Sequence, residues 1–388
     1  MQLPVDVSAV LLEARSIDEA RQTPLNVTVY LDESVPEDLS AFARDAFGAV
    51  TPNVDLSVTL YGEELPSIKL TDDVAMLIAG FSLNTGKLAS SLRGAGVPVM
   101  VVSTFPALVS QIAEASGFPV PALDVVCPAK PAGASGLAGA ASGVVGAAAG
   151  AIAHVADQMP NVPVFASRTV RAAADWGVSA AASKTADVPA FDESLEPYVL
   201  DEAHRIALGE RMGQWIIEAC PDKRLAFSLA FSFVRRPLAL DAVNSAAMQN
   251  AGIGVLDIIP GADMPLMTFN QIKMVLEIAA AYGEPMSPER LREIGFIVGG
   301  GFAFRTVARE VGGLVPVAGL VVRGTIGFTG TVAMGRAVIG YFEGGKRLSG
   351  VANVAHGVFG VASKVAGDVC AAGSKAVRTL ARRDEREA

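Results

Sequence analysis

Cysteine and histidine are scarce in this sequence and are scattered along it. Its 388 residues include 3 Cys and 3 His. Cys127, Cys220 and Cys370 lie far apart and do not form the paired spacings of zinc sites or redox centres. An odd, scattered set of thiols is typical of a reducing compartment, where buried cysteines serve as small hydrophobic side chains. The sequence therefore predicts neither a metal site nor a cofactor.

Charge is also scarce, and it is unevenly distributed. Charged residues make up 18% of the chain, against about 25% in an average soluble domain, so much of the surface is expected to be buried against protein or lipid. The net charge is −9, yet residues 344–388 carry 8 basic and 4 acidic residues. A body this acidic argues against nucleic acid as a partner, because binding to phosphate backbones requires clustered Lys and Arg.

The N-terminus lacks the basic start and apolar core of a secretory signal peptide. We expect the bulk of the chain to remain inside the cell.

Strand and helix patterns alternate over residues 1–130. Alternation of this kind predicts helices packed on a mostly parallel sheet, whose ligands usually bind at the carboxyl ends of the strands. The expected strands are Leu25–Leu31, Val54–Tyr61, Asp73–Gly80, Val97–Val102 and Asp124–Val126, and the expected helices are Glu37–Phe47, Thr85–Gly94 and Pro106–Ser116.

The segment from Gly80 to Leu88 follows a predicted strand and opens a predicted helix, as a phosphate-binding loop does. Such a loop requires four residues between its glycines and a Ser or Thr after the lysine. Here five residues separate Gly80 from Gly86, and Leu88 follows Lys87. We therefore predict no catalytic residue and an ordinary strand–loop–helix turn, with Gly80, Gly86 and Lys87 as the candidates for an atypical nucleotide site.

The order of elements in the second half of this region resembles the later half of a GTPase domain. The Asn-Lys-x-Asp motif that reads guanine is missing after the strand that ends at Val102, where Ser103-Thr104-Phe105-Pro106 stands instead. The expected fold class is an α/β N-terminal domain, similar to a degenerate G-domain, followed by an all-α C-terminal module.

Residues 200–343 carry a fixed order of Pro, Gly, Asp and Tyr among helical runs. It consists of Pro260, Asp263, Leu266, Thr268, Gln271, Met274, Ile278, Tyr282-Gly283, Val315-Pro316, Gly319 and Gly335-Arg336. This pattern resembles the bacterial family known as domain of unknown function 697, whose members are often predicted to be membrane proteins and are in some cases fused to GTPase domains. The resemblance implies a helical, membrane-linked module of unsettled activity.

The same residues predict helix ends. Asp263 is placed to cap a helix that starts at Met264-Pro265, Thr268 to Gln271 fit a capping box at which the helix restarts, and Gly283 ends it. Further on, Arg323 divides two apolar runs, each shorter than the roughly 20 residues of a membrane span. There we expect two packed helices joined near Arg323-Gly324.

Two segments have biased composition. Residues 131–190 form a Gly/Ala-rich connector whose first part, 131–153, is uncharged and could span a bilayer, insert conditionally or remain in a soluble environment. Residues 344–388 form a basic amphipathic tail with a heptad seam, suited to an anionic membrane surface or to a docked helix. The expected domains are therefore 1–130, 131–190, 191–343 and 344–388.

Two classes of function remain. The first is a non-enzymatic, membrane-associated interaction or scaffold protein on the cytoplasmic side, with a homo-oligomer or another protein as partner. The second is a nucleotide-binding or GTPase-system component that uses the segment Gly80–Lys87. A purely cytoplasmic location is the alternative to membrane association.

Overall fold

The computed structural model describes residues 7–48, 51–128, 196–255, 263–286 and 318–344. It contains a five-stranded, entirely parallel sheet with the strand order β2-β1-β3-β4-β5. The strands are β1 (Leu25–Asp32), β2 (Val54–Tyr61), β3 (Val74–Ile78), β4 (Val99–Val102) and β5 (Val125–Val126). The predicted α/β arrangement is confirmed. The predicted connector, 131–190, lies entirely outside the described residues, and so does the predicted tail from residue 345 onward.

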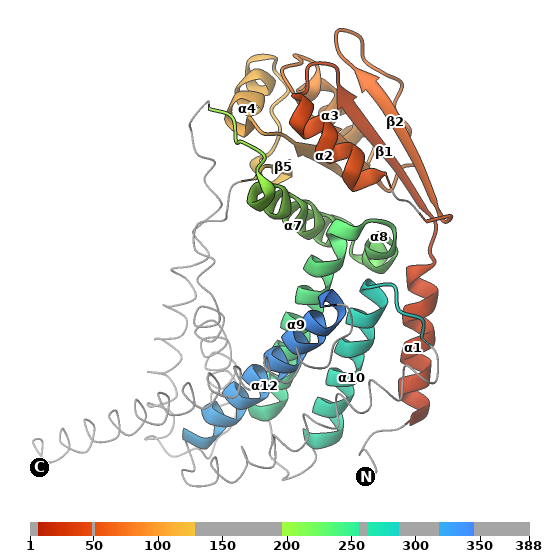
Figure 1. The fold of residues 1–388 in the computed structure, drawn as a ribbon, viewed down its shortest axis with the longest axis vertical. Coiled ribbons are helices and arrows are strands. Elements are labelled where there is room, and N and C mark those ends of the chain that lie inside the picture. The colour runs from red at the N-terminus through yellow and green to blue at the C-terminus, as the bar shows by residue number, and fades with distance from the viewer. Residues whose placement is uncertain (1–6, 49–50, 129–195, 256–262, 287–317, 345–388) are drawn as a thin grey trace, which may run out of the picture.

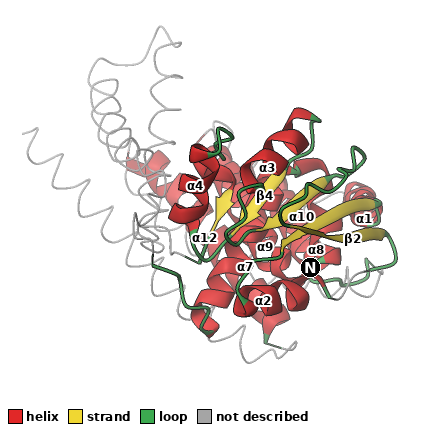
Figure 2. Ribbon diagram, turned by 90° about the horizontal axis from the view of Figure 1, so that it is seen from above, coloured by secondary structure: helices red, strands yellow, loops and turns green. Residues whose placement is uncertain are grey.

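Helices cover both faces of the sheet. The connecting elements are α2 (Glu37–Phe47), α3 (Thr85–Gly94), α4 (Pro106–Ala115) and the short 3-10 helix η1 (Ala122–Asp124). Seen from above, α3 and α4 lie on one side of the strands and α2 on the other (Figure 2). Alternate residues of each strand supply the two cores: Val29 and Met76 point to the α2 side, whereas Ala75 and Leu77 pack with α3 and α4.

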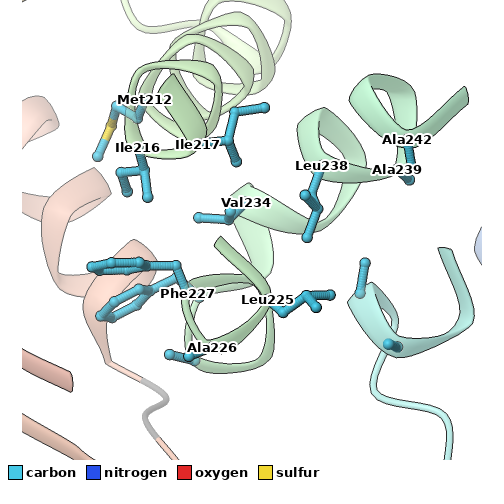
Figure 3. Close-up of a cluster of buried hydrophobic side chains, with 14 of the residues drawn as sticks. Met212, Ile216, Ile217, Leu225, Ala226, Phe227, Val234, Leu238, Ala239 and Ala242 are labelled. Carbon is cyan, nitrogen blue, oxygen red and sulfur yellow. The ribbon is translucent and has the colours of Figure 1, made fainter. Parts of the chain in front are cut away.

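A group of helices lies below the sheet in Figure 1. It comprises α7 (Glu202–Ala219), the 3-10 helix η2 (Pro221–Lys223), α8 (Arg224–Ala230), α9 (Ser232–Val255), α10 (Asp263–Ala281) and α12 (Ala318–Glu343). Buried side chains of α7, α8 and α9 pack together at its centre (Figure 3). Among the described residues, every element from Glu202 to Glu343 is a helix.

The first described helix, α1 (Val7–Arg21), packs against α10 and α8 of this helical group (Figure 1). Lys273 of α10 forms a 2.9 Å ion pair with Glu13, and Arg21 donates a 2.7 Å hydrogen bond to the carbonyl of Glu284. α1 was not predicted from the sequence. Residues 1–130 therefore contribute to both parts of the structure.

Two of the predicted helix boundaries are wrong. α10 runs without interruption from Asp263 to Ala281, so the helix does not restart at Thr268. Its end is as predicted, because Gly283 adopts a left-handed φ of 78°. α12 continues through Arg323 as a single helix of 26 residues. Tertiary packing outweighs the cost of about 1 kcal/mol per interior glycine, because α12 lies along α9 so closely that a Cβ on Gly335 would collide with Val243.

An aromatic cluster joins the sheet to the helical group. The ring of Phe47, at the end of α2, meets Phe231 edge-on at 5.5 Å and Phe233 at 5.6 Å. In addition, Lys223 forms a 2.6 Å ion pair with Asp73, which lies just before β3. One continuous hydrophobic core therefore runs from the α2 face of the sheet into the helical group.

Candidate functional site

The strand order locates the most promising ligand site at the carboxyl edge of the sheet. In doubly wound sheets, ligands bind where the strand order reverses, and in this order that point lies between the ends of β1 and β3. β1 ends at Asp32, and the loop after β3 contains Gly80. The structure therefore places the predicted segment Gly80–Lys87 at the switch point.

A carboxylate already occupies the centre of this switch point. Asp32, which is 1% exposed, accepts hydrogen bonds from the amides of Gly80 at 2.9 Å and Ser82 at 3.0 Å through one oxygen. Its other oxygen accepts from the amide of Ser34 at 2.9 Å and from the Ser34 hydroxyl at 2.7 Å. The Ser34 hydroxyl in turn accepts from the amide of Phe81 at 2.7 Å. Three consecutive loop amides are thus bonded within the protein.

The two glycines of the segment are explained by close packing. A Cβ on Gly80 would lie 2.6 Å from the backbone carbon and oxygen of Ser34. A Cβ on Gly86 would collide with the carbonyl of Phe118 and come within 2.9 Å of the Cβ of Ala113 in α4. Gly80 lets the β3 loop approach the β1 loop, and Gly86 lets α3 approach α4.

The rest of the segment is anchored to the loop after β2. The side-chain amide of Asn84 donates 2.8 Å hydrogen bonds to the carbonyls of Gly62 and Glu63. The Ser82 hydroxyl donates to the same Gly62 carbonyl at 3.2 Å. Lys87 is exposed on α3, and its carbonyl accepts a 2.9 Å hydrogen bond from Ser91. The segment is therefore held by its neighbours along most of its length.

Tyr61 completes the buried polar group at this edge. It ends β2, is 1% exposed, and its hydroxyl lies 3.0 Å from Thr85 Oγ1. Burial raises the pKa of Tyr61, and the nearby charge of Asp32 raises it further. Asp32, Ser34 and Tyr61 were not predicted as site residues from the sequence. The available signal was the Asp-x-Ser sequence directly after the first strand, since such residues bond to nearby loop amides.

The outer surface of the same edge is apolar. Phe81 is 43% exposed and Leu83 is 70% exposed, although both belong to the loop after β3. The ring of Phe81 lies 4.9 Å from that of Phe105, which follows β4. We name Phe81, Leu83 and Phe105 the edge patch. Large apolar side chains that are exposed next to one another on a loop held by hydrogen bonds are suited to a contact surface.

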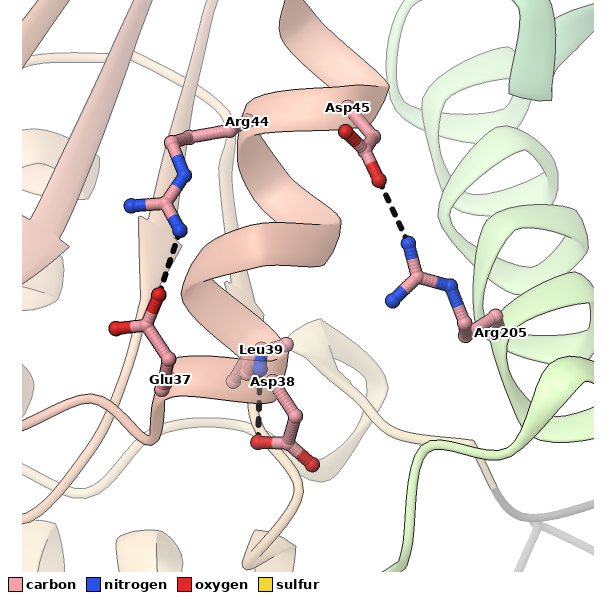
Figure 4. A network of polar contacts seen from close by, with 6 residues as sticks. All are labelled: Glu37, Asp38, Leu39, Arg44, Asp45 and Arg205. Carbon is pink, nitrogen blue, oxygen red and sulfur yellow. Dashed lines mark hydrogen bonds and ion pairs between the residues drawn. The ribbon is translucent and has the colours of Figure 1, made fainter.

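A second concave feature lies between α2 and the start of α7. It is an open groove of about 330 Å³ lined by Phe42, Asp45, Ala46, Arg205, Ile206, Gly209, Glu210, Ser232, Phe233 and Arg236. Arg205 pairs with Asp45 at 2.8 Å (Figure 4) and lies over the ring of Phe42. Arg236 pairs with Glu210 at 2.9 Å and with Glu343 at 2.7 Å. Both arginines of the groove are therefore matched by carboxylates of the protein.

Metal-binding groups do not converge anywhere in the described part of the chain. It contains no group of three or more His, Cys, Asp or Glu side chains placed to hold a metal ion. Cys127 is buried, and its carbonyl accepts a 2.6 Å hydrogen bond from Arg211. Burial raises the pKa of Cys220 to about 11, which keeps this thiol protonated and unreactive near neutral pH.

Comparison with known proteins gives no relative. No model of a protein family matches the chain, and no curated protein and no solved structure matches it significantly. Within the described ranges, no helix combines the length and the apolar character that crossing a bilayer requires.

Proposed function

We propose that this protein is a non-catalytic interaction protein whose α/β domain presents the carboxyl edge of its sheet to a protein partner. The observation that carries the proposal is the position of Asp32. In a phosphate-binding loop, free amides converge on the anion. Here the Asp32 carboxylate accepts two of those amides and Ser34 a third, so an internal anion stands where a phosphate would bind.

The edge patch supports the same proposal. Phe81 and Leu83 extend outward from the loop that Asp32 holds in place, so the loop is rigid while its apolar side chains remain available. Apolar side chains held on a rigid backbone lose little entropy when a partner binds them. A loop of this construction is suited to contact with a protein surface.

The G-domain resemblance fits the proposal as the origin of the fold. A G-domain that had lost hydrolysis would retain its strands and the loop at the switch point, and it would lose the guanine-reading motif, as in this chain. We also propose that the protein associates with the cytoplasmic side of a membrane, and the resemblance of residues 200–343 to the domain of unknown function 697 family supports this part of the proposal.

Calorimetry separates this function from nucleotide handling. The purified full chain is titrated with GTP, GDP, ATP and ADP in the presence of Mg²⁺, and we expect no saturable heat. The control is the Lys87→Ala variant, which changes an exposed side chain. Saturable binding by the parent chain that disappears in Lys87→Ala would show that the segment is an atypical nucleotide site and would overturn the proposal.

Membrane association is tested through the basic tail. Lys375, Arg378, Arg382 and Arg383 are replaced together by Gln, and flotation of the full chain is measured on anionic and on neutral vesicles. Because each basic residue near an anionic surface contributes about 1 kcal/mol, we expect the variant to bind anionic vesicles more weakly and the parent to lose binding as salt is added. Equal flotation of parent and variant at low salt would remove the tail from the proposal.

A further inference from the structure

β2 forms one edge of the sheet, and its outer side is unpaired among the described residues (Figure 1). The strand is eight residues long and stays in register with β1 over its whole length. Proteins usually protect such an edge with proline, a bulge or charged side chains, because free backbone groups recruit another strand. β2 contains no proline and a single charged residue, Asp55.

One face of β2 is an apolar stripe made of the half-buried Leu56 and the exposed Val58 and Leu60. Val58 is 64% exposed and Leu60 is 60% exposed. They stand in register with Val29 and Leu31 of β1, so the stripe lies on the face of the sheet that α2 covers further in. Lys69 contacts Ser57 on the opposite face and leaves the stripe uncovered.

The backbone of β2 points outward at these same residues. The amide of Leu25 bonds to the carbonyl of Asn53 at 3.0 Å, and the amide of Glu33 bonds to the carbonyl of Tyr61 at 2.9 Å. In a parallel ladder, backbone groups alternate between the two sides of the strand. Odd-numbered residues of β2 therefore bond to β1, and even-numbered residues direct their N–H and C=O groups away from the sheet.

We propose that β2 is a homodimer interface, at which the strand pairs antiparallel with β2 of a second copy about a two-fold axis beside Val58. This register sets Val58 against the partner's Val58 and Leu56 against the partner's Leu60. Both the outward backbone groups and the apolar side chains fall on even-numbered residues, so one register satisfies both. The two five-stranded sheets become continuous across the axis.

Charge also favours a second copy as the occupant. In this register Asp55 lies opposite the partner's Tyr61. The two Asp55 residues are therefore six strand positions apart, which at roughly 3.4 Å per residue separates them by about 20 Å. No like charges oppose each other along the paired strands, since Asp55 is the only charged residue of β2. This inference goes beyond the proposed function, because it concerns a different surface, the β2 edge, and it does not depend on Asp32 or the edge patch.

Crosslinking tests the register. The full chain carrying Val58→Cys is oxidised mildly, and crosslinked dimer is measured against the parent chain, whose native cysteines set the background. Paired residues in this geometry have Cα atoms about 5.5 Å apart, which suits a disulfide. Leu56→Cys is the matched control, because it lies on the same face but opposite the partner's Leu60. For Val58→Cys we expect a disulfide that joins the two copies of the peptide containing residue 58. For Leu56→Cys we expect crosslinked dimer to remain at background.

Disruption tests the interface. Leu60→Lys places a charge in the exposed stripe, where it should not disturb the fold, and Leu12→Lys is the control at a 72% exposed site on α1. We expect sedimentation to show a dimer for the parent and for Leu12→Lys, and an association constant lowered about tenfold or more for Leu60→Lys. A monomeric parent chain, or a dimer that neither crosslinks through Val58→Cys nor weakens in Leu60→Lys, would overturn the proposal. Both results are independent of nucleotide titration.

Discussion

The side-chain amide of Asn250 donates a 2.9 Å hydrogen bond to Thr331 Oγ1, which joins α9 to α12 in the interior of the helical group. Gln271 of α10 donates to the same oxygen at 3.2 Å, and Asn270 donates to the Asn250 carbonyl oxygen. Thr331, Asn250 and Gln271 are all buried. One hydroxyl thus ties three helices together, and Gln271 takes part in tertiary bonding and not in the predicted capping box.

Replacing Thr331 by Val should destabilise the protein. Valine has a similar shape but leaves two buried amide donors without this acceptor, and each unsatisfied group costs about 1–3 kcal/mol. The measurement is the free energy of unfolding in denaturant. Ser245→Ala is the control, because Ser245 also accepts an amide hydrogen bond, from Gln249, but at an exposed position of α9. A loss no larger than that of the control would contradict the structural role of the network.

Replacing Asp32 by Ala should destabilise the α/β domain by several kcal/mol, since the amides of Gly80 and Ser82 lose their acceptor at about 1–3 kcal/mol each. Formate should recover part of the loss, because it supplies the missing carboxylate. The measurement is the melting temperature in formate and in chloride at equal ionic strength, compared with the parent chain. An equal response of variant and parent to formate would contradict the role of Asp32 as an internal anion.

Glu277 should make the stability of the protein depend on pH. Burial within α10 raises the pKa of this carboxyl, although Arg224 lies 3.6 Å away and acts in the opposite direction. The folded protein therefore holds this proton more tightly than the unfolded chain, and stability is lost as pH rises through the raised pKa. We expect Glu277→Gln to stabilise the protein near neutral pH, while Arg224 keeps its 2.9 Å partner Asp241.

The benefit of Glu277→Gln should shrink as pH falls towards the ordinary glutamate pKa of 4.5, where the parent carboxyl is protonated too. Denaturant unfolding at a series of pH values provides the test. Glu114→Gln, at an exposed position of α4, is the control and should show no such trend. A stabilisation that stays constant with pH would argue against the buried carboxyl as its source.

Phe47→Ala should weaken the link between the sheet and the helical group. The side chain is 5% exposed and its ring meets Phe231 and Phe233, so truncation should cost about 3–5 kcal/mol. Phe47→Leu, which keeps most of the volume, should cost about 1.5 kcal/mol or less. If thermal unfolding followed by circular dichroism shows equal losses for the two variants, the aromatic cluster does not stabilise the junction.

The elements of the sheet could be predicted because their patterns are local. β2, α2 and α3 begin and end where the sequence indicates, since apolar runs there are bounded by Gly, Pro and Asp residues. The end of α10 at Gly283 was predictable for the same reason. At these positions the neighbouring residues determine where each element begins and ends.

The remaining features depend on partners far away in the sequence. Asp32 was not predicted as a site residue, because the amide of Gly80 that it binds lies 48 residues later. α12 was expected to break at Arg323. Its packing against α9, which keeps it continuous, cannot be predicted from the sequence of α12 alone. α1 was missed because few of its side chains are buried, among them Ala14 and Ile17, so its apolar pattern is weak.

The contact between α1 and α10 also determines when the protein can complete its fold during synthesis. α1 ends at Arg21 and the helix that receives it ends at Ala281. At about 5–20 residues per second, a ribosome needs roughly 13–50 s to synthesise the intervening chain. During that interval the sheet can form once β5 has been synthesised, but α8, which also packs against α1, follows only at Arg224–Ala230, and Lys273, the partner of Glu13, follows later still. The first helix of the nascent chain is thus among the last to reach its place, and until then it is open to chaperones.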